Sequence, residues 1–181
     1  MSLTFNEKKA TQAAGRLLER AGNRMSVMKL VRMLYLADRE AIVRWGRPIT
    51  TDRFVFLQHG PVLVQVSSLV AEGDDPRLEP SLWSAHITRP RDGAVDLQGS
   101  LDCRQLSDGE LEVLDEIARR HEASTPWELA DLTRGLPEWQ DPHGGAIPFG
   151  IQDILAAQAR TGKPVPAVEP GPEEAFLNFS W

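Results

Sequence analysis

Residues 26–45 constrain the fold of this 181-residue chain more than any other segment. Ser26 is a typical helix N-cap, and apolar residues then fall on most faces of a helix over residues 27–45. Gly46 and Pro48 end that helix. A helix with so much apolar surface is stable only where other elements cover it on several sides. The segment therefore predicts a long central helix with the rest of the chain packed around it.

The remaining segments predict a mainly α fold, a compact single helical domain with a small antiparallel β element. Helical spacing and capping signals indicate the further helices, and apolar alternation beside turn residues indicates the strands. The expected helices are residues 4–21, residues 60–70 with Pro61 as the first helical position, one after Ser107, one after Thr125, and one that opens at Pro148. The expected strands are residues 53–58 and a hairpin within residues 83–98 that turns at Asp92-Gly93.

The chain divides into one domain and a tail. Residues 1–161 are expected to form the helical domain, and residues 162–181 a proline-rich linker with an apolar end. In an extended end, Phe179 and Trp181 lie on the same side, a pattern that suits a strand added to a sheet edge. We therefore expect the tail to dock in a preformed groove, either on its own domain or on another chain.

The charge is distributed unevenly. Residues 1–53 carry 11 Lys and Arg against 5 Asp and Glu, although the whole chain has a net charge of −6. A basic first third is typical of a surface for nucleic acid or for an acidic partner. The alternative, which the scattered positions of the basic residues favour, is that basic helices pack beside acidic ones. Because a pI near 5.3 implies repulsion from phosphate, a nucleic-acid partner is not expected.

Catalytic and cofactor signatures are not found. The sequence has no phosphate-binding glycine loop, no nucleophile elbow and no His-Glu-x-x-His zinc helix, and its four histidines lack ligand spacing. We therefore expect no cofactor, no metal and no enzymatic activity. One enzyme alternative stays open, in which His59 meets Asp38 or Asp52 in a cleft. The single Cys103 and the lack of a long apolar run favour a cytoplasmic protein that does not enter a membrane.

Five segments together carry a resemblance to a known family. In order and spacing they resemble the Panacea domain, which is found in SocA-like antitoxins and phage-associated proteins. The five segments are residues 28–38, 46–54, 59–62, 127–133 and 137–139. The similarity covers about residues 8–160. It implies a helical cytoplasmic domain that neutralises a cognate protein toxin by direct contact. Some relatives resemble adaptors that deliver a toxin to an ATP-dependent protease.

The chain departs from the family pattern in two places. Arg134 follows Thr133 where the family often has histidine, and Gln58 stands where a basic residue is common. The leading hypothesis is an antitoxin that binds its toxin. The alternatives are a proteolytic adaptor, another interaction module, the enzyme described above and a DNA-binding autorepressor. The protein could also form a homo-oligomer. The candidate partner-binding residues are Asp38, Arg39, Asp52, Arg53, His59, Arg134, Trp139, Phe179 and Trp181.

Overall fold

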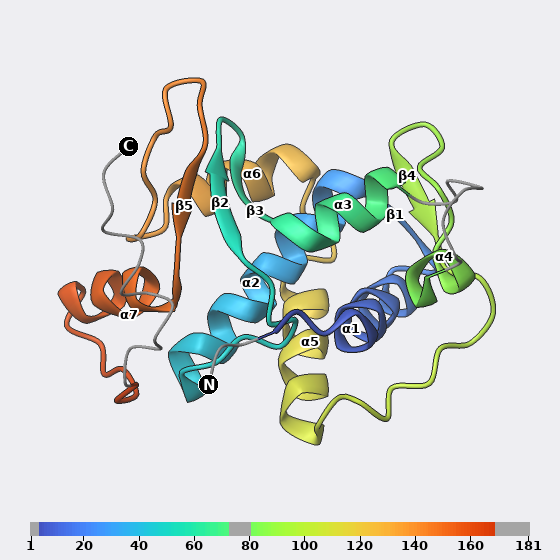
Figure 1. The fold of residues 1–181 in the computed structure, drawn as a ribbon, viewed down its shortest axis with the longest axis horizontal. Coiled ribbons are helices and arrows are strands. Elements are labelled where there is room, and N and C mark those ends of the chain that lie inside the picture. The colour runs from blue at the N-terminus through green and yellow to red at the C-terminus, as the bar shows by residue number, and fades with distance from the viewer. Residues whose placement is uncertain (1–3, 73–80, 169–181) are drawn as a thin grey trace.

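Helix α2 (Val27–Trp45) runs through the middle of the molecule, as Figure 1 shows. The computed structural model describes residues 4–72 and 81–168. The elements before and around the first hairpin are α1 (Glu7–Arg20), β1 (Arg24–Ser26), β2 (Phe54–Leu57), β3 (Gly60–Leu63) and α3 (Val64–Glu72). The later elements are α4 (Leu82–His86), β4 (Ala94–Asp96), α5 (Asp108–Arg120), α6 (Pro126–Arg134), β5 (Ile147–Phe149) and α7 (Ile151–Arg160). The mainly α fold with a small antiparallel β element is confirmed.

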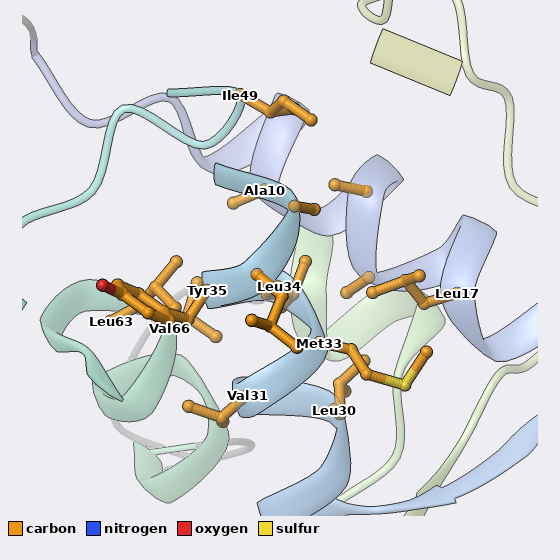
Figure 2. Packing of buried hydrophobic residues seen from close by; sticks show 14 of the residues in the cluster. Ala10, Leu17, Leu30, Val31, Met33, Leu34, Tyr35, Ile49, Leu63 and Val66 are labelled. Carbon is orange, nitrogen blue, oxygen red and sulfur yellow. The ribbon is translucent and has the colours of Figure 1, made fainter. Parts of the chain in front are cut away.

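The side chains of α2 are buried on opposite sides of the helix. Leu34 lies toward α1, whereas Tyr35 lies toward Leu63 and Val66 in β3 and α3 (Figure 2). Helices α5, α6 and α7 also pack against α2. These helices and strand β3 cover α2 on several sides, which is the arrangement that its near-continuous apolar surface requires. The prediction of a central helix is confirmed.

Two small antiparallel sheets flank this helix. Strand β1 pairs with β4, and β2 lies between β3 and β5 in the second sheet. The Phe56 and Phe149 rings stack on neighbouring strands with their centroids 3.7 Å apart, and the Phe54 and Tyr35 rings pack in a T-shaped pair. One face of the second sheet is thus fixed against α2 by aromatic contacts.

Two of the predicted helix starts are wrong, because both prolines lie in strands. Pro61 lies in β3, where it pairs with Phe56, and α3 begins only at Val64. Pro148 lies in β5, and α7 begins at Ile151. The fixed φ of proline suits a strand at the sheet edge as well as the first turn of a helix. Pairing with β2 decides between the two conformations, within a tight hairpin for Pro61 and across most of the chain for Pro148.

The expected hairpin at residues 83–98 is shorter than predicted. Its first residues form the short helix α4, because Ser81 accepts a hydrogen bond from the Ser84 N–H and caps it. The isolated bridges Ile87–Leu97 and Arg91–Ala94 join the two arms around the predicted Asp92-Gly93 turn. Strand β4 takes β1 as its partner instead.

Basic residues of α1 and α2 pair with acidic residues of α5. Arg16 and Arg20 both donate to Asp115 at 2.7–2.9 Å, and Arg44 donates to Glu116 at 2.6 Å. Burial acts in the opposite direction, yet the hydrogen bonds from the two arginines hold the pKa of Asp115 at about 2. The favoured interpretation of the uneven charge, basic helices beside acidic ones, is confirmed.

The chain after α7 returns to the C-terminal end of α2. Gln152 donates to the Val168 carbonyl at 3.3 Å, and a Cβ on Gly46 would meet the Val168 side chain at 2.2 Å. Gly46 also has a φ of 76°, so glycine is required there for two reasons. The division at residue 161 stays a prediction, and Phe179 and Trp181 lie outside the described residues. None of the helices in the described ranges is both long and apolar enough to span a membrane.

Candidate functional site

Asp38 supports the loop after α2 from inside the protein. Its carboxylate accepts hydrogen bonds from the Ile49 N–H at 2.8 Å, the Thr50 N–H at 2.9 Å and the Thr50 hydroxyl. Burial raises the pKa of Asp38 to about 7, although these hydrogen bonds act in the opposite direction. The side chain is fully buried and presents no surface to a partner in this conformation.

Asp52, a candidate partner-binding residue, is also buried. Its two carboxylate oxygens accept from the Gln65 and Val66 N–H groups at 2.9 Å, which satisfies the first turn of α3. Burial raises the pKa of Asp52. Arg53, the next residue, is exposed, and its backbone N–H donates to Asp52 at 2.7 Å. Of this predicted pair, only Arg53 faces solvent.

Arg39 belongs to a network that joins α2 to the later part of the chain. Its guanidinium donates to both oxygens of Glu138, at 2.7 and 3.1 Å, and to Gln158 on α7 at 2.9 Å. Tyr35 donates to the same Glu138 carboxylate at 2.7 Å. The neighbouring Trp139 is half-buried, with its ring edge on Phe56. In the described structure Arg39 and Trp139 therefore contact the protein interior.

His59 does not meet the carboxylates of the enzyme alternative. It lies in the turn between β2 and β3, exposed, with its ring 5.7 Å from the Trp127 ring at an angle of 86°. Asp38 and Asp52 both share a hydrogen bond with Thr50, but among the described residues neither shares one with His59. A cluster of three or more His, Cys, Asp or Glu able to hold a metal is likewise not found in that part of the chain.

The tip of the β2–β3 hairpin lies beside α6 and exposes apolar side chains. Trp127 at the start of α6 is 60% exposed, and Leu57 at the end of β2 is 40% exposed. We call Leu57, His59, Trp127 and Arg134 the hairpin–α6 surface. Figure 1 shows α6 next to this hairpin. The surface joins two predicted residues, His59 and Arg134, with two that were not predicted.

A pattern within the sequence indicates why Trp127 and Leu57 are exposed. On α6 the buried residues are Leu129, Ala130 and Thr133, which share one face, and Trp127 lies to one side of that face. On β2 the buried Phe54 and Phe56 alternate with Val55 and Leu57, so Leu57 points away from the core. Applied to these two elements, the helical and strand periods would have found both residues.

A buried arginine of α2 holds the turn of the β2–β3 hairpin by hydrogen bonds. Arg32 of α2 donates to the His59 carbonyl at 2.6 Å and to the Pro61 carbonyl at 2.8 Å. A Cβ on Gly60 would lie 2.7 Å from the Thr133 hydroxyl and 3.1 Å from Arg32 Nε, and the φ of Gly60 is 114°. Only glycine fits this conformation. The hairpin tip is therefore held rigidly between α2 and α6.

One comparison with known proteins identifies a family. The family model described as "Antitoxin SocA-like, Panacea domain" matches residues 30–140, which is more than half of the chain. The match contains the hairpin–α6 surface, Arg32 and both buried aspartates. Searches against curated proteins and solved structures gave no match. The chain belongs to the SocA-like antitoxin family through its Panacea domain.

Proposed function

We propose that this protein is a cytoplasmic antitoxin that neutralises a cognate protein toxin by binding it stoichiometrically, without catalysis. Membership of the SocA-like family supports an antitoxin role in general. The single observation that supports direct binding is the hairpin–α6 surface, where Trp127 stands 60% exposed beside His59. Tryptophan is the side chain most enriched among residues that dominate binding energy at protein interfaces.

The rigidity of this surface supports the same proposal. Arg32 holds the hairpin turn by two carbonyl groups, and the capping box of Thr125 and Glu128 fixes the start of α6. A surface that is already ordered loses little conformational entropy on binding, so more of the contact energy appears as affinity. An occluding antitoxin needs this property because it must bind its toxin tightly.

The proposal is tested with the protein encoded by the neighbouring reading frame as the candidate toxin. The two proteins are co-expressed, co-purified through a tag on one of them, and then titrated against each other in an assay of toxin activity. We expect a stable complex, and toxin activity that reaches zero at a fixed molar ratio and is unchanged by a metal chelator. Rescue from a large toxin excess by trace antitoxin would contradict stoichiometric binding.

A second measurement in the co-expressing cells distinguishes occlusion of the toxin from its delivery to a protease. Toxin half-life is measured by pulse-chase with and without the antitoxin. Occlusion leaves the toxin present and bound, whereas an adaptor shortens its half-life in cells that contain the ATP-dependent protease.

A further inference from the structure

The hairpin–α6 surface lies above a positive charge that the described part of the chain does not balance. The guanidinium of Arg32 is buried, and its hydrogen bonds go to two backbone carbonyls and to no carboxylate. Its Nε is buried without any hydrogen-bond partner. Burial first, and then the nearby positive Arg134, lower the pKa of Arg32 to about 10. Arg16, Arg39 and Arg44, by contrast, each pair with a carboxylate.

Arg134 adds a second positive charge near Arg32, and this one lies at the surface. It lies at the end of α6, is exposed, and pairs with the exposed Asp131 one turn earlier. Such an exposed ion pair contributes little to stability, so Arg134 is readily available to another carboxylate. Burial of a charge without a counter-ion is unfavourable, and a carboxylate that arrives from outside reduces that penalty. The surface is therefore complementary to an acidic group.

The geometry of α6 places an apolar contact at a defined distance from this charge. Trp127 and Arg134 are seven residues apart, so they lie on the same side of the helix and about 10 Å apart along its axis. His59 contacts the Trp127 ring from the hairpin. A ligand that uses both ends needs an acidic group and an apolar group separated by about 10 Å, which corresponds to three residues of an extended strand.

We infer that the hairpin–α6 surface binds an acidic segment of the toxin, in which an Asp or Glu carboxylate pairs with Arg134 above the buried Arg32 while an apolar side chain packs on Trp127. This inference rests on the proposed function and adds the chemistry of the partner. A protein segment with one carboxylate fits better than a nucleic acid, because the net charge of −6 repels the many phosphates of a nucleic-acid backbone more strongly than a single acidic group.

The test compares two variants of this surface with two controls. Arg134→Glu reverses the exposed charge, and Trp127→Ala removes the apolar contact. Leu132→Ala is the matched apolar control, because Leu132 is 42% exposed on the same helix but about 140° around its axis from Trp127. Arg160→Glu is the charge control, since it reverses an exposed arginine at the end of α7. All four are first shown by circular dichroism to unfold at the wild-type temperature.

Binding to the toxin purified in the test of the proposed function is then measured by isothermal titration calorimetry at low and high salt. We expect Arg134→Glu and Trp127→Ala each to weaken binding at least about tenfold, and both controls to stay within about twofold. Salt should weaken wild-type binding more than that of Arg134→Glu. A Lys substitution at one exposed Asp or Glu of the toxin should restore binding to Arg134→Glu.

Three outcomes would overturn the inference. Wild-type affinity in both surface variants shows that the toxin binds elsewhere, and leaves the proposed function intact. Displacement of the toxin from the wild type by a 20-base-pair DNA duplex, with no such displacement from Arg134→Glu, assigns the surface to nucleic acid. Failure of the wild type itself to bind the toxin contradicts the proposed function, and with it the inference.

Discussion

Asp38 accepts hydrogen bonds from backbone N–H groups of a loop, which lie outside the helices and strands. The loop between α2 and β2 has little regular structure, and this one carboxylate accepts from two successive N–H groups and a hydroxyl in it. Asp52 does the same for the first turn of α3. Buried backbone groups need such partners, because an unsatisfied donor is costly away from water. These two residues therefore define the course of the chain from α2 into the hairpin.

Burial of Asp38 predicts an unusual pH dependence of stability. Its pKa in the folded protein is about 7, whereas an unfolded aspartate titrates near pH 4. Between about pH 4 and pH 7 the folded state binds more protons at this site, so its contribution to the free energy of unfolding falls as pH rises. Asp38→Asn carries no charge at any pH, and we expect its stability relative to the wild type to increase from pH 5 to pH 8.

Urea unfolding at pH 5 and pH 8 measures this effect. Glu112→Gln, on the exposed side of α5, controls for the loss of one negative charge. A difference between Asp38→Asn and the wild type that does not change with pH would contradict the prediction.

At the scale of the element, α2 determines the stability of the molecule. It contacts helices and strands from both ends of the chain, and Leu34 at its centre is fully buried beside α1. Leu34→Ala is expected to lower the free energy of unfolding by about 2–5 kcal/mol, because it removes apolar contacts and leaves a cavity. Val43→Ala, a half-buried site on the same helix, should lower it less. Chemical denaturation measures both, and an unchanged free energy of unfolding in Leu34→Ala would place the core elsewhere.

How far the sequence predicts an element depends on whether local signals decide its conformation. Helix α2 could be predicted because its apolar surface can be buried only at the centre of the fold. The starts of α5 and α6 could be predicted because each capping box lies within four residues of sequence. Strand β5 could not, since Pro148 suits a helix start equally well and pairing with the distant strand β2 decides. The hairpin–α6 surface depends on two elements about 70 residues apart meeting side by side, and no local pattern contains that contact.

At the scale of the whole molecule, the tail is the segment for which the sequence predicts docking in a preformed groove. The described chain packs on α2 as far as Val168, and Phe179 and Trp181 lie beyond it. We expect deletion of residues 173–181 to leave the helical domain folded, because the described helices pack on α2 within residues 4–168. The same deletion should weaken self-association or toxin binding, which size-exclusion chromatography and calorimetry measure. A truncated protein with wild-type oligomeric state, toxin affinity and melting temperature would make the tail a passive end.

The pairing of α1 and α2 with α5 has a consequence for the nascent chain. Asp115 and Glu116 are synthesised about 70 residues after Arg44, so at about 5–20 residues per second the basic N-terminal third waits several seconds for its acidic partners. During that interval a segment with 11 cationic residues has 5 acidic residues of its own. Translation that stops before α5 therefore yields a fragment that lacks the charges against which its first two helices pack.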